Sequence, residues 1–192
     1  MSRCLILVAL LCGPLAQAGG AQLPWRSLSG APVTGPRLNT PCPALHLPPT
    51  WDVRSQVYAD VTGDGAPECV LSVWRPWNDW PLARWATRPT PIVNNCDALG
   101  YSSHIAVLKP RAGGRYAQVW VGSALFQPVT ALTVRPDGTL VTLETTYAQG
   151  RSVQSVALSE WRWTGFGFVL ERRVNLRARQ LALTSAGEPA LR

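Results

Sequence analysis

From Trp51 onward, apolar and polar residues alternate in short runs with the period of two that is typical of β-strands. These runs are rich in β-branched and aromatic residues, and glycine-containing turns separate them. The period of 3.6 residues that an amphipathic helix requires is not evident in any window. The pattern predicts eight strands, near residues 53–60, 67–74, 104–109, 115–121, 129–135, 139–146, 153–163 and 166–174.

The eight expected strands fall into two sets of four that resemble each other. Asp64-Gly65 precedes an apolar strand in the first set, and Asp137-Gly138 does the same in the second. Each set also ends in a glycine-containing hairpin. The sequence therefore predicts an all-β domain of two four-stranded antiparallel, blade-like sheets. The boundaries are residues 51–184 for the domain, about 53–122 and about 128–176 for the two sheets, and 185–192 for a C-terminal tail.

Two blade-like sheets cannot close a β-propeller, which typically needs at least four blades. One solution is a sandwich-like body in which the two sheets pack face to face and bury their inner side chains. The other is a partial propeller that a partner or a second copy of the chain completes. We expect the first arrangement for a monomer, and the sequence does not fix the oligomeric state.

The turn between the first two expected strands carries an unusual set of oxygen-bearing side chains. In the nine-residue run DVTGDGAPE, such side chains stand at Asp60, Thr62, Asp64 and Glu68, with glycines at the fourth and sixth positions. Ca²⁺ binds six to eight oxygens, and alternate residues of a tight loop can point inward together. An EF-hand is excluded, because its twelfth position requires a glutamate and is Leu71 here.

A plain hairpin turn at Asp64-Gly65 is the alternative to a metal loop. Such a turn has no need of Asp60 or Glu68, so the full set of residues favours a metal. The run and the apolar strand after it resemble the repeat loop of the FG-GAP/VCBS class, the calcium-loop blades of integrin-like β-propellers. The resemblance implies one Ca²⁺ held by the side chains of Asp60, Thr62, Asp64 and Glu68 and by the carbonyl of Ala66.

The second repeat lacks this set of ligands. Thr133 and Arg135 stand at two of the ligand positions, and no acidic residue matches Glu68. In the first repeat, Thr62 itself replaces the acidic residue that is usual in the family. We therefore expect a single calcium site of weak affinity.

A long insertion at residues 75–103 separates the second and third expected strands of the first sheet. Its tryptophans and arginines suit two roles, either binding a sugar or peptide ligand or covering an open sheet face. We favour the covering role, since a two-sheet body leaves broad faces exposed. The candidate ligand-binding residues are Arg75, Trp77, Trp80, Arg84 and Trp85.

The N-terminus has the features of an export signal at residues 1–18: a basic start at Arg3, an apolar run and an Ala-Gln-Ala cleavage site. We expect cleavage before Gly19, no transmembrane segment after it, and a secreted or periplasmic protein of the cell envelope. Residues 19–50 are rich in proline and glycine, and we expect a linker that lies over the surface or is disordered.

The chain has a net charge of +7, but its arginines are scattered rather than gathered in one groove between stacking aromatics. Export also argues against nucleic acid as a partner. The exception is a group of arginines at residues 172–179, which we interpret as a solvated basic face. An envelope protein or polysaccharide is the expected partner class.

Three cysteines remain after the signal: Cys42, Cys69 and Cys96. Export permits a disulfide, and three thiols allow three different pairings. Cys69 falls inside an expected strand, where we expect a buried free thiol. Cys42 and Cys96 lie in proline-rich irregular segments, so we predict a Cys42–Cys96 bridge.

Evidence for an enzyme is poor, because the sequence contains no H-E-x-x-H, G-x-S-x-G or C-x-x-C motif and no phosphate-binding glycine loop. Ser102, Ser103, His104, Asp97 and Cys96 are close in sequence, but spacing alone does not make a catalytic set. We expect a non-catalytic binding or interaction module of the cell envelope with a calcium-stabilised loop. The alternative is a carbohydrate-binding or carbohydrate-active protein that uses the Trp-rich insertion.

Overall fold

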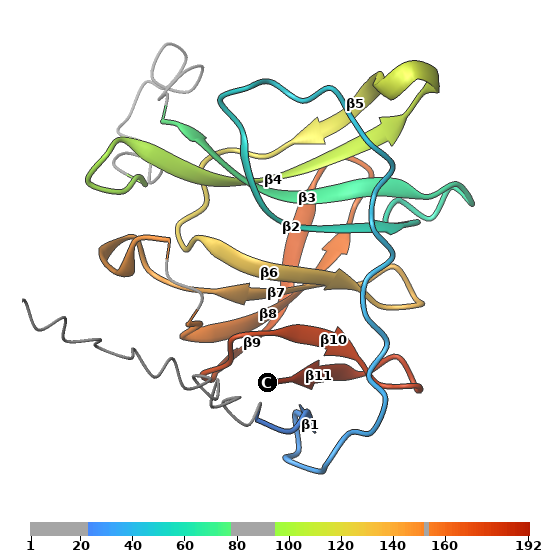
Figure 1. The fold of residues 1–192 in the computed structure, drawn as a ribbon, viewed down its shortest axis with the longest axis vertical. Helices are drawn as coiled ribbons and strands as arrows, with labels where there is room; N and C mark the ends of the chain where they lie inside the picture. Colours follow the sequence, from blue (N-terminus) through green and yellow to red (C-terminus); the bar gives the residue numbers. More distant parts are fainter. Residues whose placement is uncertain (1–22, 78–94, 152–153) are drawn as a thin grey trace, which may run out of the picture.

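The structure is a computed structural model, and it describes residues 23–77, 95–151 and 154–192. The regular structure of this part of the chain consists of antiparallel strands and short 3₁₀ turns at Ala112–Gly114 and Tyr147–Gln149 (Figure 1). The strands are β1 (Arg26–Ser27), β2 (Asp52–Ala59), β3 (Glu68–Pro76), β4 (Tyr101–Pro110), β5 (Tyr116–Val121), β6 (Val129–Val134), β7 (Leu140–Glu144), β8 (Ala157–Trp163), β9 (Phe168–Asn175), β10 (Leu181–Leu183) and β11 (Pro189–Leu191).

Two four-stranded antiparallel sheets form the body of the protein. The first has the order β2-β3-β4-β5 and the second the order β6-β7-β8-β9, so each strand pairs with its neighbours in sequence. Glycines with positive φ turn two of the hairpins, Gly138 between β6 and β7 and Gly165 between β8 and β9. The structure confirms the predicted all-β fold, and each predicted strand overlaps an observed one.

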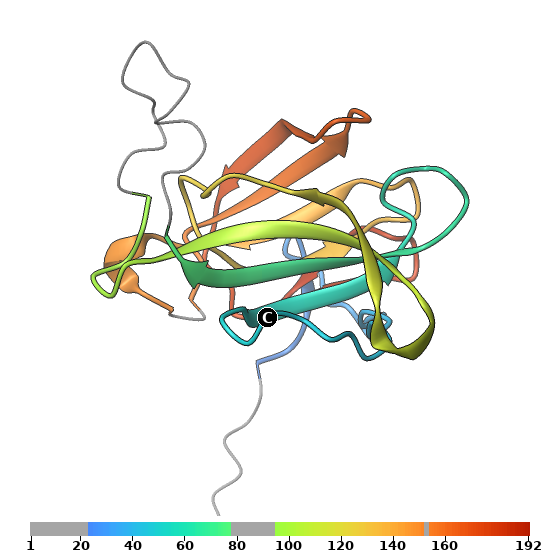
Figure 2. The same ribbon diagram turned by 90° about the horizontal axis from the view of Figure 1, so that it is seen from above.

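The two four-stranded sheets pack face to face around an apolar core. Because side chains alternate along a strand, every second residue of β2–β4 points toward the second sheet. Figure 2, seen from above, shows the strands of the first sheet crossing those of the second at an angle. The core consists of Val57, Val61, Val70, Ile105 and Val107 from the first sheet and its loop, and Val129, Leu132, Val134 and Leu140 from the second.

Hydrogen bonds between the two sheets supplement this core. The buried Ser72 hydroxyl of β3 donates to the carbonyl of Val129 in β6 at 2.8 Å. In the opposite direction, the N–H of Leu132 donates to the Ser55 hydroxyl at 3.0 Å. These two hydrogen bonds fix β2 and β3 against β6.

A third sheet of three short strands, with the order β1-β11-β10, was not predicted. It lies against the second sheet on the side away from the first (Figure 1). Leu181 and Leu191 of this sheet pack with Val141, Leu143 and Leu158 of the second. Residues 189–191, which fall within the expected C-terminal tail, are its central strand. The body thus has three layers of sheet.

The segment before β2 runs along one side of all three sheets (Figure 1). We call residues 37–51 the strap. At the third sheet, Arg37 forms a backbone bridge with Leu183. Between the two large sheets, the Asn39 side-chain N–H₂ donates to the carbonyls of Gln56 at 3.0 Å and Leu132 at 2.7 Å.

The end of the strap covers the outer face of the first sheet. Leu45, Leu47 and Trp51 of the strap pack against a buried cluster from β3 and β4, which contains Cys69, Leu71, Val73, Ala106 and Leu108. The chain at residues 42–50, within a segment expected to be a linker over the surface or to be disordered, is therefore part of the fold.

The predicted Cys42–Cys96 disulfide is wrong. The bridge joins Cys42 to Cys69, with a Cα–Cα distance of 5.5 Å, and Cys96 is free. Cys69 is fully buried in β3, as expected, but its side chain points outward beneath the strap. Because the strap packs over this face, Cys42 comes within disulfide reach of Cys69. A disulfide fits an oxidising compartment.

Other expectations concern segments outside the described residues. The export signal at residues 1–18 is one of them, and so is most of the Trp-rich insertion. Among the described residues, no helix has the length and apolar character needed to cross a membrane.

Candidate metal site

The loop between β2 and β3 is shaped by hydrogen bonds to its own carboxylates. Asp60 Oδ1 accepts from the N–H of Gly63 at 2.7 Å, and Asp60 Oδ2 accepts from the N–H of Gly65 at 2.8 Å. Both glycines have positive φ, 75° and 84°, a conformation that residues with a Cβ resist. The sequence thus folds the loop around Asp60.

Glu68 enters this loop from the first position of β3. Its side chain lies on the face of β3 that is turned toward the second sheet, and the residue is fully buried. The Glu68 carboxylate accepts from the N–H of Val61 and from the Thr62 hydroxyl, both at 3.3 Å. Burial raises the pKa of Glu68, because a charged carboxylate loses its hydration there.

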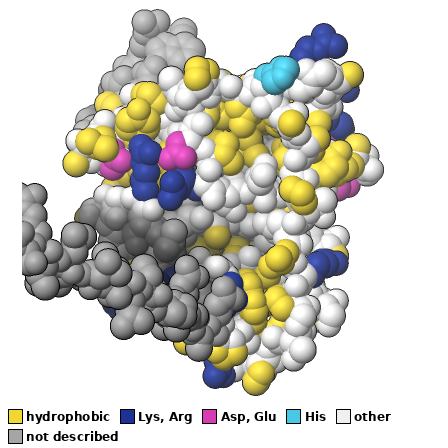
Figure 3. All heavy atoms as spheres, in the orientation of Figure 1, with side chains coloured by type: hydrophobic (Ala, Val, Ile, Leu, Met, Phe, Trp, Pro, Cys, Tyr) yellow, Lys and Arg dark blue, Asp and Glu magenta, His cyan; other side chains and the backbone are white. Residues whose placement is uncertain are grey.

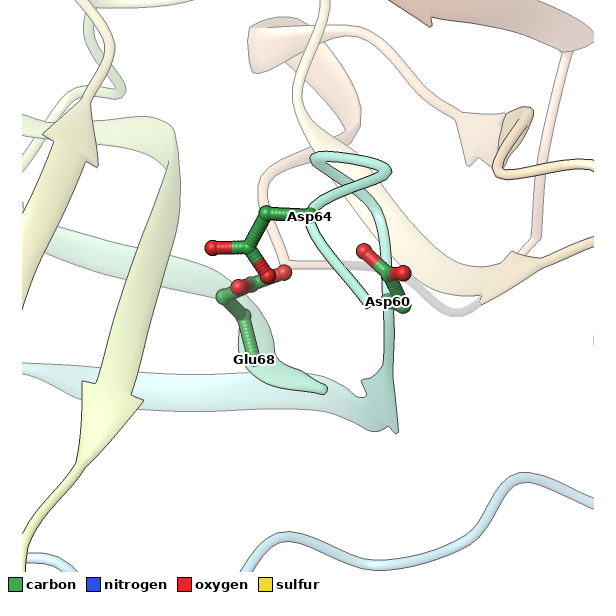
Figure 4. Close-up of side chains that lie close together, drawn as sticks. All are labelled: Asp60, Asp64 and Glu68. Atoms are coloured by element: carbon green, nitrogen blue, oxygen red, sulfur yellow. The ribbon is translucent and has the colours of Figure 1, made fainter. Parts of the chain in front are cut away.

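Asp60, Asp64 and Glu68 together form a compact acidic triad (Figure 4). One carboxylate oxygen from each residue lies within 4.8 Å of those from the other two. Thr62 points its hydroxyl at Glu68, and Ala66 donates its N–H to Asp64 at 2.9 Å. The structure brings the three predicted carboxylate ligands together, and such oxygens are the donors that hard cations prefer. Coordination by the Thr62 hydroxyl and the Ala66 carbonyl stays a prediction.

Lys109 of β4, a residue that the sequence analysis did not assign to the site, contacts the triad. Its Nζ lies 2.7 Å from Asp64 Oδ2 and 3.7 Å from Glu68 Oε1. Its hydrogen bond lowers the pKa of Asp64. Lys109 is the only lysine in the sequence, and this was the one feature of the sequence that could have drawn attention to it.

The matching turn of the second sheet has a different chemistry. Asp137 Oδ1 accepts from the N–H of Thr139 at 3.0 Å, as in an ordinary Asx turn. Arg135, at a former ligand position, makes an ion pair with Glu188 at 2.7 Å. Within residues 23–77, 95–151 and 154–192, the triad is the single group of three acidic, histidine or cysteine side chains close enough for one ion.

The described part of the Trp-rich insertion contributes to packing. The Arg75 guanidinium lies 5.9 Å from the centre of the Trp51 ring, and burial lowers the pKa of Arg75. The backbone N–H of Trp77 donates to the Gly100 carbonyl at 2.7 Å. Trp80, Arg84 and Trp85 lie outside the described residues, so ligand binding by this insertion stays a prediction.

His104 and Ser102 form a hydrogen-bonded pair inside the first sheet. His104 Nδ1 donates to the Gly122 carbonyl at 2.8 Å, so His104 Nε2 accepts from the Ser102 hydroxyl at 2.7 Å. Ser102 is fully buried and His104 nearly so, which denies a substrate access to either side chain. Burial, with the charge of Arg75, lowers the pKa of His104 to about 4.

This buried imidazole predicts a loss of stability on acidification. An unfolded histidine takes up a proton near pH 6.5, whereas His104 in the folded protein does so near pH 4. The stability that neutral His104 provides is complete above pH 6.5 and is lost as the pH falls toward 4. The gap between the two pKa values corresponds to about 3 kcal/mol.

Urea unfolding of wild type and His104→Gln at pH 7.5 and pH 4.5 measures this effect. Burial raises the pKa values of Glu68 and Glu144, and these residues oppose the loss, so the difference between the two proteins is the informative quantity. We expect wild type to lose more stability than the variant, by up to about 3 kcal/mol. Equal losses would show that His104 is not the group responsible.

The surface charge of the described residues is mixed in sign. On the face drawn in Figure 3, one group contains both basic and acidic side chains, and the other basic side chains are scattered among apolar and uncharged polar surface. The arginines of β9 are paired as well: Arg172 lies 3.9 Å from Glu160 and Arg173 2.9 Å from Glu144. These contacts do not favour a basic groove.

No protein-family model matches the chain, and a search of the curated proteins gives no significant match. The resemblance to FG-GAP/VCBS repeats therefore rests on the loop residues themselves.

Proposed function

We propose that the protein is a secreted or periplasmic, non-catalytic binding or interaction module of the cell envelope, and that Ca²⁺ stabilises its β2–β3 loop. The observation that carries the calcium proposal is the triad of Asp60, Asp64 and Glu68, whose oxygens converge within 4.8 Å. A plain turn does not require a fully buried glutamate at its end. The disulfide supports a module that works outside the cytoplasm.

The donor set suits Ca²⁺ in number and kind. Three carboxylates and the Thr62 hydroxyl are hard oxygen donors, and water can supply the remaining positions. Lys109 already places a cationic group against two of the carboxylates, which supports a preference of this loop for positive charge. Ca²⁺, with two positive charges, could hold all three carboxylates with one ion.

The place of the loop in the fold gives such an ion a structural effect. Gly138 of the second sheet approaches the loop so closely that a Cβ there would lie 3.7 Å from the Asp60 carbonyl oxygen. Val61, the next residue of the loop, belongs to the core between the two sheets. An ion that orders residues 60–68 would therefore stabilise the contact between the sheets as well as the hairpin.

Thermal unfolding in EDTA and in 10 mM Ca²⁺ tests this proposal. A ligand that binds the folded state alone stabilises it by about 1.4 to 2.7 kcal/mol when present at ten to one hundred times its dissociation constant. With affinity on the order of 10⁻⁴ to 10⁻³ M, we expect Ca²⁺ to raise the melting temperature of wild type by about 3 to 10 °C.

Two variants make this test specific. Asp64→Ala should lose the rise, because it removes a ligand. Asp137→Ala is the matched control, since it alters the Asp-Gly turn of the second sheet and leaves the triad intact; the rise should persist. If wild type melts at the same temperature in both buffers, the loop is a turn and the calcium proposal fails.

A further inference from the structure

We propose that Lys109 is a built-in competitor for the cation of the β2–β3 loop, so that Ca²⁺ must displace its ammonium group before it can bind. This inference rests on the proposed calcium site. It assigns Lys109 a role that neither the loop sequence nor the FG-GAP/VCBS resemblance contains, namely setting the affinity of the site.

The pairing of β3 with β4 places Lys109 against the triad. Cys69 lies opposite Leu108 in this antiparallel pair, so one further step along the strands brings Glu68 and Lys109 face to face. Neighbours across strands interact directly. The ammonium group reaches both Asp64 Oδ2, at 2.7 Å, and Glu68 Oε1, at 3.7 Å. A residue 45 positions away in sequence from Asp64 thus supplies the positive charge at the loop.

The contacts of Lys109 conflict with those that Ca²⁺ requires. Ca²⁺ needs six to eight oxygens at 2.3–2.6 Å, and Asp64 Oδ2 is one of the few candidate donors here. The two carboxylate oxygens of Asp60, Asp64 Oδ1 and Glu68 Oε2 already accept backbone hydrogen bonds. An ammonium group in hydrogen-bond contact with Asp64 would also repel a divalent ion bound to the same carboxylate. Binding of Ca²⁺ therefore requires that Lys109 move.

The lysine side chain can make that movement. It is 28% exposed, and its four-carbon stem is flexible, so the ammonium can turn into solvent when an ion takes its place. Without Ca²⁺, the same group offsets the repulsion among three carboxylates. Lys109 is thus expected to have two opposite effects, stabilising the ion-free loop and weakening calcium binding.

Calorimetric titration of EDTA-stripped protein with CaCl₂, together with melting curves in EDTA, measures both effects. Replacement of Lys109 by methionine removes the charge and keeps the length of the side chain. For Lys109→Met we expect a dissociation constant about three- to tenfold lower than that of wild type, from loss of the competing ion pair and of the repulsion. We also expect a lower melting temperature in EDTA.

Three further variants keep the result interpretable. Lys109→Gln is a second neutral replacement that covers the case in which Lys109→Met does not fold. Lys109→Arg retains the charge and should bind Ca²⁺ within about threefold of wild type. Arg111→Met removes the same unit charge from an exposed position two residues further on and should leave the dissociation constant nearly unchanged.

The outcomes separate this inference from the calcium proposal. If wild type binds Ca²⁺ and both neutral variants bind it equally or more weakly, Lys109 is not a competitor, and the calcium site stands without it. If Arg111→Met tightens binding as much as Lys109→Met does, the effect is one of net charge and the inference also fails. Absence of binding in every variant would overturn the calcium proposal itself.

Discussion

Replacing Cys42 with alanine is expected to lower the free energy of unfolding by about 3–4 kcal/mol. The Cys42–Cys69 bridge closes a loop of 27 residues, and loss of that constraint on the unfolded chain has this magnitude in the chain-entropy model. The bridge also holds the strap over the outer face of the first sheet, where Leu45 and Leu47 pack. Cys42→Ala should loosen this cover.

Urea unfolding of the oxidised proteins measures the loss, with Cys96→Ala as the matched control. Cys96 is a free thiol, so its replacement should change stability far less than Cys42→Ala. Peptide mapping without reduction should recover Cys42 joined to Cys69. Equal losses in the two variants, with a Cys42–Cys96 peptide, would contradict the observed pairing.

Replacing Ala190 with aspartate is expected to destabilise the protein by at least about 4 kcal/mol. Ala190 is fully buried in β11, the central strand of the third sheet, with Ala182 opposite it in β10 and Ser27 opposite it in β1. A carboxylate at this position would lose its hydration without gaining a partner, and such substitutions are among the most destabilising.

Ser185→Asp is the control for this substitution, because it introduces the same charge at an exposed position of the β10–β11 turn. Thermal or urea unfolding of both variants should show a large loss for Ala190→Asp and a change within about 0.5 kcal/mol for Ser185→Asp. Small and similar effects would mean that residues 189–191 are a tail, as the sequence pattern alone had indicated.

The two large sheets were predictable because their strands carry local signals. Each has five or more residues of β-type composition and ends near a turn, and their pairing follows the order of the chain. The third sheet has no such signals. Its strands are two or three residues long, and β1 pairs with β11 from the opposite end of the chain. Only the burial of side chains such as Leu181 against the second sheet reveals it.

The disulfide shows a related limit of sequence reasoning. Cys69 lies in a strand that is buried on both faces, which made a free thiol plausible. The disulfide partner of Cys69 depends on which segment covers the outer face of the first sheet. That segment is the strap, and the sequence of the strap has no periodic pattern from which its path could be predicted. Proline-rich composition indicated an irregular conformation but not its position.

The candidate metal site was predictable only where its residues are close in sequence. Asp60, Asp64 and Glu68 belong to one loop, so their spacing carried the information, and the structure brings them together. Lys109 arrives from another strand through the β3–β4 register. The sequence alone does not give this register, and the position of Lys109 opposite Glu68 follows only from the observed pairing.

A crystal structure of the protein grown in 10 mM Ca²⁺ tests the central claim most directly. The account predicts one ion between Asp60, Asp64 and Glu68, with six to eight oxygens at 2.3–2.6 Å and the Lys109 ammonium turned away from Asp64. A loop without an ion at this calcium concentration, with Lys109 still paired to Asp64, would contradict it.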